Sequence, residues 1–349
     1  MASGQTPPGR GCWAAAVTWA GTAWPRLLAA VPPRLRSGVR WPVAARALWH
    51  GMGKVALALA MIAGASSAAA GQGEQFVLTD TVYQQKSLYR NILVREGEGY
   101  RCMQFGRFQA RQTCIQIGQP HRLVLNYTRG LFAALYLAPQ PPRRVLVLGL
   151  GGGVMPMALR AVDANMHIDT VELDPAVLAV ARSHFGYRED ARLRSHVDDA
   201  RVFVRKQRRA AAVYDLVLID AFDRDYIPEH LLTREFLHEV QSLLAPQGVL
   251  AANTFAAGTL ARHEAATYQA VFGQLYNVDM QGGNRIMLAR RDGLPPLPEV
   301  QKNAALWDER LALLGLSSRD LLPRFAPQPS ATGVRVLTDQ YSPSNLLLR

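Results

Sequence analysis

From about residue 144 onward, hydrophobic and polar positions form blocks with the lengths of strands and helices. Apolar runs of five or six residues recur at His167–Glu172, Tyr214–Ile219 and Val249–Thr254 and predict buried strands. Longer amphipathic segments between them, such as Pro175–Phe185 and Leu260–Phe272, predict helices. Strands that alternate with crossover helices specify a mostly parallel sheet covered on both faces. The other expected strands are Val145–Leu148, Arg192–Val197, Leu275–Asp279 and Arg285–Ala289, and the other expected helices are Ala200–Gln207, Leu232–Leu244 and 298–323.

The region before this α/β pattern alternates differently. Short, partly alternating segments separated by glycines predict a small antiparallel sheet. A helix is expected over Leu123–Leu137, and the proline-rich stretch 138–142 then separates it from the first strand of the large sheet. The expected strands of the small sheet are Gln75–Leu78, Asn91–Glu96, Tyr100–Phe105 and Thr113–Gln116.

The net charge of +12 is concentrated at the N-terminus of the chain. Residues 1–73 hold seven basic residues and no acid, and subtracting these seven leaves +5 for the rest. Such a mild excess gives no reason to expect a nucleic-acid partner. The densest basic cluster, 205–209, follows a predicted helix, where cations are stabilised by the helix dipole, so a solvated face is favoured over an anion patch.

Residues 52–70 have the order of parts found in an export signal. Lys54 precedes the apolar run Val55–Ala63, and small residues end the segment at Ala70. We expect either cleavage near Gly71 or an uncleaved membrane anchor, and therefore a membrane-associated or exported, periplasmic protein. A cytoplasmic protein that begins at Met1 is the alternative.

Cysteine and histidine usage gives no metal-binding pattern. Cys102 and Cys114 lie twelve residues apart in the expected antiparallel region, where either a cross-strand disulfide or two isolated buried thiols fit. The eight histidines are scattered without paired ligand spacing, so we expect no metal site.

The strongest chemical signal is the glycine turn after the strand Val145–Leu148. Gly149, Gly151 and Gly153 let the backbone approach a ligand without Cβ clashes. Glu172 ends the next strand, where a carboxylate can accept hydrogen bonds from two ribose hydroxyls at once. The spacing predicts a nucleoside-binding half of a doubly wound sheet.

Further acids follow the next two strands. Asp199 fits an acceptor for an adenine amino group as well as an N-cap for the following helix. Asp220 and Asp223 lie on one short loop, where carboxylates bind an amine and accept its proton; an Asx turn is the alternative for Asp223. Because the carboxyl ends of parallel strands meet at one edge of the sheet, these acids are expected to share a cup.

The span 75–345 resembles the spermidine/spermine synthase (aminopropyltransferase) family, in its divergent spermidine synthase-like branch. The carrying motifs are Val145–Gly153, Val171–Pro175, Asp199–Arg201, Asp220–Asp223 with downstream Pro228, Leu231, Thr233 and Phe236, and the ending 337–343.

The resemblance implies a Rossmann-like class I S-adenosylmethionine-dependent methyltransferase fold with a small N-terminal β-domain. The implied division of the chain is a poorly ordered leader over 1–73, the β-domain over 74–122, the catalytic domain over 123–295 and a helical extension and tail over 296–349. A homodimer is also expected.

Residue by residue, the resemblance implies that the glycine turn and Glu172 hold the nucleoside and that Asp199 meets the adenine. Asp220 is the implied base, Asp223 contacts the acceptor amine, and Tyr127 matches an aromatic position of the family.

Four residues at three places in the chain depart from the family pattern. Gly152 replaces an acid that holds the aminopropyl ammonium, Arg90 replaces a Gln, and Thr128-Arg129 replace a His-Glu pair. These changes make a dicationic acceptor electrostatically less favourable.

The expected reaction is transfer of an aminopropyl group from decarboxylated S-adenosylmethionine to an amine, with no permanently bound cofactor. An S-adenosylmethionine-dependent methyltransferase and a non-catalytic nucleoside-binding module are the alternatives. The predicted export conflicts with the cytoplasmic supply of the decarboxylated donor.

Overall fold

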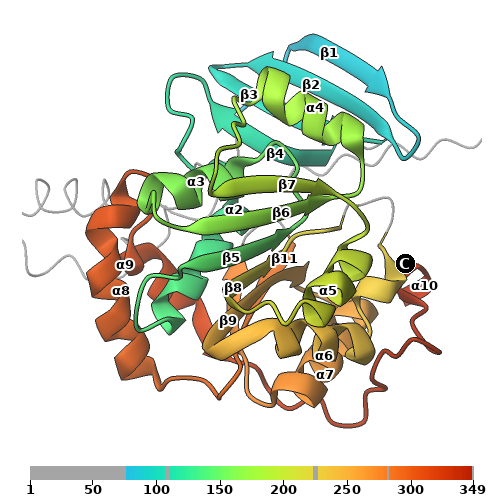
Figure 1. The fold of residues 1–349 in the computed structure, drawn as a ribbon, viewed down its shortest axis with the longest axis vertical. Coiled ribbons are helices and arrows are strands. Elements are labelled where there is room, and N and C mark those ends of the chain that lie inside the picture. Colours follow the sequence, from blue (N-terminus) through green and yellow to red (C-terminus); the bar gives the residue numbers. More distant parts are fainter. Residues whose placement is uncertain (1–75, 107–109, 223–226, 281–282, 348–349) are drawn as a thin grey trace, which may run out of the picture. The chain divides into compact units, whose positions relative to one another are not determined.

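The computed structural model describes residues 76–106, 110–222, 227–280 and 283–347. An eight-stranded sheet runs through this part in the order β12-β10-β11-β9-β8-β5-β6-β7 (Figure 1). The pairs from β9 through β8, β5 and β6 to β7 are parallel, and β11, β10 and β12 add antiparallel strands at one edge. The strands are β5 (Arg144–Leu148), β6 (His167–Glu172), β7 (Leu193–Val197), β8 (Tyr214–Ile219), β9 (Leu244–Phe255), β10 (Tyr276–Met280), β11 (Asn284–Arg290) and β12 (Phe325–Pro327).

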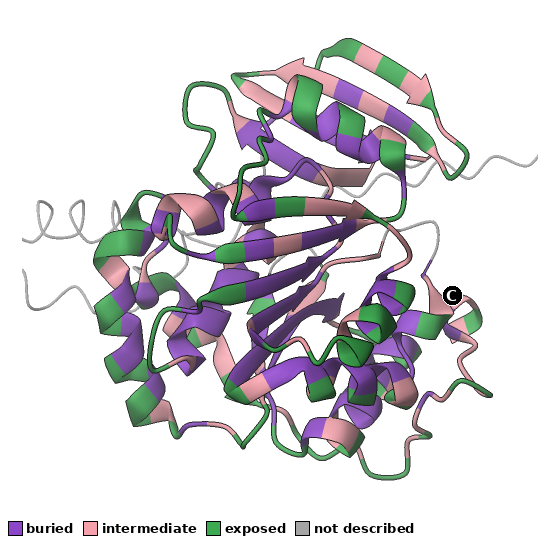
Figure 2. Cartoon of the chain, in the orientation of Figure 1, coloured by how far each residue is buried: buried purple, intermediate pink, exposed green. Residues whose placement is uncertain are grey.

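Both faces of the sheet are covered, as the sequence predicted. Val145 and Val147 of β5 belong to one hydrophobic core, and Leu146 and Leu148 belong to the other, because successive side chains of a strand point to opposite faces. The continuous apolar runs therefore reflect burial on both sides (Figure 2). The first core includes α3 (Val154–Val162), α4 (Pro175–His184) and α8 (Leu297–Ala312); the second includes α5 (Ala200–Arg209), α6 (Arg234–Leu243) and α7 (Gly258–Phe272).

A four-stranded antiparallel sheet precedes the large sheet in the chain. Its strands are paired in chain order and lie beside α4, where the Arg101 guanidinium donates to the His184 carbonyl at 2.6 Å. The predicted strand Gln75–Leu78 is wrong: Phe76 and Leu78 bury their side chains without joining the ladder, and Gln75 lies outside the described residues. The strands are β1 (Asp80–Lys86), β2 (Asn91–Gly97), β3 (Tyr100–Phe105) and β4 (Ala110–Gln116).

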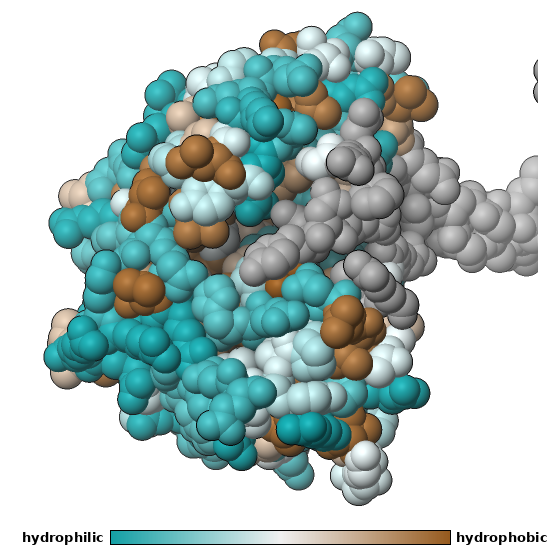
Figure 3. All heavy atoms as spheres, turned by 90° about the vertical axis from the view of Figure 1, so that its right-hand side faces the viewer, coloured by the Kyte–Doolittle hydropathy of each residue, from teal (hydrophilic) through white to brown (hydrophobic). Residues whose placement is uncertain are grey.

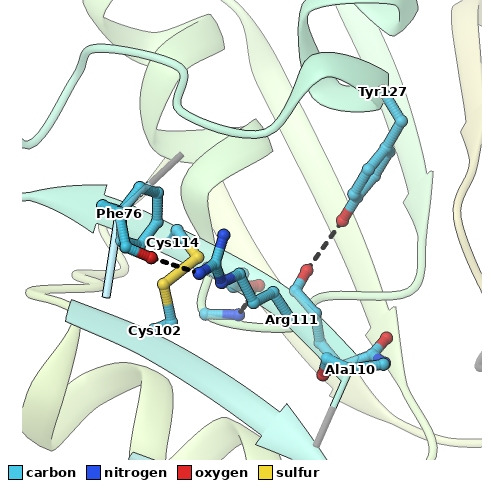
Figure 4. The surroundings of a disulfide bond; sticks show 9 residues. Phe76, Cys102, Ala110, Arg111, Cys114 and Tyr127 are labelled. Atoms are coloured by element: carbon cyan, nitrogen blue, oxygen red, sulfur yellow. Dashed lines mark hydrogen bonds between the residues drawn. A yellow bond between two sulfur atoms is a disulfide. The ribbon is translucent and has the colours of Figure 1, made fainter. Parts of the chain in front are cut away.

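A disulfide joins the two strands of this sheet that lie nearest the glycine turn. Cys102 of β3 and Cys114 of β4 are directly opposite in the strand register and are bonded (Figure 4). Of the two alternatives that the sequence left open, the structure therefore has the cross-strand disulfide.

Two predicted helices are broken in the structure. The segment Leu123–Leu137 forms α2 (Asn126–Leu131) followed by the 3₁₀ helix η2 (Phe132–Leu137). The segment 298–323 is interrupted at Gly315, where φ is +72° and favours glycine. It continues as α9 (Ser318–Leu321) and η4 (Leu322–Arg324).

The C-terminal segment is tied to the large sheet through a buried arginine. Arg201 of α5 donates to Glu239 at 3.0 Å and to Asp339 at 2.6 Å. Thr233, the N-cap of α6, also donates to Asp339. The tail that the sequence left irregular is thus held at Asp339, and it ends in the short helix α10 (Ser344–Leu347).

Two features concern contact with a membrane: the length of the helices and the distribution of exposed hydrophobic residues. Across the described ranges, no helix is long and apolar enough to cross a bilayer. On the face shown in Figure 3, the exposed hydrophobic residues lie in separate small groups. The predicted leader, including the signal or anchor segment 52–70, lies outside the described residues.

Candidate functional site

A cavity of about 590 Å³ opens at the carboxyl ends of β5, β6, β7 and β8. β5 lies between β6 and β8, so the strand order reverses here, which is where open α/β sheets bind ligands. We call this space the acidic cavity, because four carboxylates line it. The predicted site residues that line it are Gly149, Gly151, Glu172, Asp199, Asp220 and Tyr127.

The glycine turn brings β5 against the loop after β8. Gly149 has a φ of +97°, and a Cβ there would lie 2.0 Å from the Asp220 carbonyl oxygen. Only glycine fits this approach. Gly153 was predicted to bind the nucleoside, but it does not line the cavity. Its Cα faces the Tyr187 ring, 2.4 Å from where a Cβ would stand, so this glycine serves packing of the turn.

Glu172 is held in place by two backbone donors. The amide of Leu150 donates to one carboxylate oxygen at 3.2 Å, and the amide of Asp174 donates to the other at 3.0 Å. Burial raises the pKa of Glu172, while these amides and the charge of Arg90 lower it. Each oxygen keeps a lone pair free, so the carboxylate is oriented to accept from a ligand diol.

Asp199 has the predicted N-cap role, and its contact with an adenine stays a prediction. One carboxylate oxygen caps α5 by accepting from the amides of Arg201 and Val202 at 2.9 and 3.0 Å. The other oxygen lies 2.8 Å from Nε2 of His230. This hydrogen bond is the main cause that lowers the pKa of Asp199. The side chain therefore stays ionised at neutral pH at the rim of the cavity.

Asp220 lies at the end of β8 with its carboxylate held by an amide. Asn253 of β9 donates to it at 3.0 Å, and Asn284 of β11 donates in turn to the Asn253 carbonyl oxygen at 2.9 Å. Burial raises the pKa of Asp220 to about 6, with Glu172 adding to the rise and Asn253 and Tyr127 opposing it. A carboxylate poised near neutral pH is suited to accept a proton.

The loop between β1 and β2 forms the mouth of the acidic cavity. It carries Leu88, Tyr89 and Arg90, and the Leu88 side chain is 99% exposed. Ser87 anchors the loop by donating to the carboxylate of Asp174, the N-cap of α4. The Arg90 guanidinium stacks over Phe105, 4.5 Å from the ring centre. A basic group therefore faces the cavity beside Glu172.

Thr113 of β4 occupies the space beside Gly152, where the related family carries an acid. Its hydroxyl accepts from the Gly152 amide at 2.9 Å. A Cβ on Gly152 would meet the Thr113 methyl at 2.5 Å and the Phe185 ring at 2.9 Å. The residue at 152 is thus glycine for steric reasons, and no carboxylate fits there without repacking.

One expected contributor does not join the cavity. Arg129 was grouped with the acceptor side, but the structure places it in a different cavity, with Arg122 and Arg324. Successive residues of a helix are rotated by about 100°, so residues two apart point in nearly opposite directions. Tyr127 and Arg129 of α2 therefore line different cavities. The correction removes one of the cations expected to oppose an amine. Asp223 lies outside the described residues.

Sequence reasoning missed three residues that hold the site, namely Thr113, His230 and Asn253. Asn253 had a signal, because it is a polar residue at the end of an otherwise apolar strand. His230 comes from the 3₁₀ helix η3 (Glu229–Leu231) and Thr113 comes from the small sheet, and nothing in their local sequence marks them. In the described part of the chain, no cluster of His, Cys, Asp and Glu could hold a metal ion.

The fold is Rossmann-like, with an N-terminal antiparallel sheet and a cavity at the carboxyl ends of the parallel strands. Solved structures share this fold. A probable spermidine synthase from Corynebacterium glutamicum superposes with a TM-score of 0.58 at 20% identity, covering 75% of this chain and 97% of that one. A spermidine synthase in complex with the transition-state analogue AdoDATO gives 0.55 at 18% identity, covering 70% and 89%.

Sequence comparison gives the family. Residues 127–278 match the model of the spermine/spermidine synthase domain. The polyamine aminopropyltransferase of Vibrio vulnificus (strain CMCP6) is 39% identical over 272 residues, which cover 76% of this chain and 91% of that protein. The chain belongs to the spermine/spermidine synthase family.

Proposed function

We propose that the chain is an aminopropyltransferase of polyamine biosynthesis, which transfers an aminopropyl group from decarboxylated S-adenosylmethionine to an amine. The observation that carries the proposal is the position of Asp220. Its buried carboxylate, with a pKa near 6, opens into the same cavity as the diol acceptor Glu172. The related Vibrio enzyme is named for this activity.

In the proposed reaction, the neutral amine attacks the carbon beside the sulfonium of the donor. The new C–N bond forms as the C–S bond breaks, and methylthioadenosine leaves as a neutral thioether. Before the attack, the substrate ammonium gives one proton to Asp220, which frees the lone pair of the amine. Freeing the lone pair of an amine with a pKa near 10.4 costs roughly 4–5 kcal/mol at pH 7, which a positioned base offsets.

Residues that line the acidic cavity would position the two substrates. Glu172 accepts from the ribose hydroxyls, and Asp199 takes the adenine edge at the rim. The Tyr127 hydroxyl donates to the Gln112 carbonyl at 2.7 Å (Figure 4), and this side chain lines the acidic cavity together with Asp220. Phe222 and Leu231 also line the cavity and would exclude water.

The test is product formation with purified protein, decarboxylated S-adenosylmethionine and a panel of amines, read as methylthioadenosine. Asp220→Asn should abolish most turnover, whereas the exposed Asp292→Asn is the matched control and should retain it. Absence of methylthioadenosine with every amine would contradict the proposal.

S-adenosylmethionine is the competing donor, because two observations favour a ligand that keeps its carboxylate. No acid fits at Gly152, and Arg90 lines the cavity. Calorimetric titration with both sulfonium donors and with methylthioadenosine separates the cases. Tighter binding of S-adenosylmethionine, with formation of S-adenosylhomocysteine, would show that the chain transfers a methyl group and not an aminopropyl group.

We also propose that the protein is exported or membrane-associated. The segment 52–70 has the features of an export signal, and a disulfide such as Cys102–Cys114 is typical of oxidising compartments. Cell fractionation with N-terminal sequencing tests this. A soluble cytoplasmic species that begins at Met1 would contradict it.

A further inference from the structure

A second cavity, of about 750 Å³, shares α2 with the acidic cavity. Asn126 and Arg129 line the second cavity, whereas Tyr127 lines the first. Residues three apart on a helix lie within about 60° of each other, and the residue between them points elsewhere. One short helix therefore contributes to two separate spaces.

The second cavity is strongly basic, and we call it the basic cavity. Four arginines converge on it, and Asp320 is the only carboxylate among the described residues of its lining. The arginines come from parts of the chain that are distant in sequence: Arg122 precedes α2, Arg129 lies in it, Arg319 lies in α9, and Arg324 lies in η4. The fold thus brings these cations together.

The charges of these arginines are largely unpaired. In the described parts of the chain, the guanidiniums of Arg122, Arg129 and Arg319 form no hydrogen bond and no ion pair within 4.0 Å. Arg324 donates to the backbone carbonyls of Asp320, at 3.2 Å, and of Asp279, at 3.4 Å. It is therefore oriented by the backbone without being neutralised.

The positive charge of Arg129 lies in an unfavourable environment in the free protein. Burial lowers the pKa of its guanidinium, Arg122 and Arg324 lower it further, and Asp320 opposes them. Arginine nevertheless stays charged at neutral pH. A half-buried cation among like charges is stabilised when an anion enters the space, because desolvated guanidiniums gain hydrogen bonds and charge pairing together.

We propose that the basic cavity binds a small molecule that carries phosphate groups. The planar guanidinium donates two parallel hydrogen bonds to a phosphate, and several forks around one space match a group with oxygens on all sides. An excess of three positive charges suits a multivalent anion better than a monocarboxylate. The volume admits more than an inorganic ion. The proposal does not depend on the reaction in the acidic cavity.

Calorimetric titration of the full-length protein with pyrophosphate tests the proposal. The ionic strength is held constant within each titration, and the titration is repeated at several chloride concentrations. Binding should saturate and should weaken as chloride rises, because the charges are screened. Arg129→Met keeps much of the side-chain length, removes the charge, and should weaken binding at least tenfold, as expected for one lost charge-assisted contact. Titrations with inorganic phosphate and with glucose 6-phosphate distinguish a free ion from a phosphomonoester as the preferred form.

Three further variants keep the test decisive. Arg324→Met should weaken binding in the same direction, even if Arg129→Met changes the fold. Arg188→Met removes an exposed arginine that lines neither cavity and should leave the affinity unchanged. Glu172→Ala should lose nucleoside binding but keep pyrophosphate binding. No binding by the unmodified protein at millimolar pyrophosphate, or equal affinities of all the arginine variants, would overturn the proposal.

Discussion

The acidic cavity and the basic cavity differ in how the fold treats their charges. In the acidic cavity, groups of the protein hold the carboxylates: amides hold Glu172, Asn253 holds Asp220, and His230 holds Asp199. In the basic cavity, Arg122, Arg129 and Arg319 have no such partners among the described residues. The acidic cavity is therefore organised before its ligand arrives, whereas the basic cavity is stabilised by its ligand.

The largest effect is expected for Asp220→Asn. The substitution is nearly isosteric but removes the proton acceptor, so turnover should fall on the order of 10²–10⁴-fold while nucleoside affinity is kept. Steady-state rates and calorimetry on the same preparation measure the two quantities. Unchanged turnover would exclude Asp220 from the mechanism.

Glu172→Ala should be nearly as severe, but in binding. Two hydrogen bonds to a partly desolvated carboxylate are lost, so affinity for methylthioadenosine should fall on the order of 10²–10⁴-fold, since bonds to charged groups are worth about 1.5–3 kcal/mol each. Titration with methylthioadenosine measures the loss. An affinity within threefold of the unmodified protein would contradict the role given to this side chain.

Gly152→Asp tests whether an acid can be returned to the glycine turn. The new side chain would collide with Thr113 and Phe185, so the free energy of unfolding should fall by about 2 kcal/mol. Denaturant unfolding measures the change. Combining it with Thr113→Ser, which removes the colliding methyl group and keeps the hydroxyl, should recover part of the loss. A fully stable Gly152→Asp protein would show that the turn can rearrange.

The pH dependence should be smaller, and it should separate the two cavities. Because the pKa of Asp220 lies at about 6, turnover should fall roughly tenfold between pH 7 and pH 5 as the base becomes protonated. Sulfate, whose charge is constant over this range, should bind the basic cavity equally at both pH values. A flat rate profile would exclude a base with this pKa.

The same shift has the opposite sign for stability. A carboxyl whose pKa is raised in the folded state stabilises the fold most at low pH, and this contribution is lost as pH rises through about 6. Asp220→Asn should therefore raise the melting temperature at pH 8 relative to the unmodified protein. The gain should disappear near pH 4.

The α/β core could be predicted because strands buried on both faces are continuous apolar runs and their crossover helices are amphipathic. β1 was missed because it is a polar edge strand with no hydrophobic face. The acidic cavity could be predicted for a geometric reason. Parallel strands end at one edge of the sheet, so Glu172, Asp199 and Asp220 lie close together.

The rest of the site required three-dimensional information. Neighbours in sequence diverge on a helix or in a turn, which is why Arg129 and Gly153 face away from the acidic cavity. Conversely, Thr113, His230 and Asn253 reach the site from separate elements, and no spacing along the chain connects them to their partners Gly152, Asp199 and Asp220.

The contact between Arg201 and Asp339 has a consequence for synthesis of the protein. Arg201 lies two residues after Asp199, at the start of α5, yet one of its two carboxylate partners is separated from it by 138 residues of chain. During vectorial synthesis, α5 is made long before Asp339 exists. The guanidinium, whose side chain is 7% exposed in the finished structure, must stay hydrated or rely on Glu239 until then. The part of the acidic cavity that Asp199 lines can therefore reach its final form only after the chain has been translated as far as Asp339.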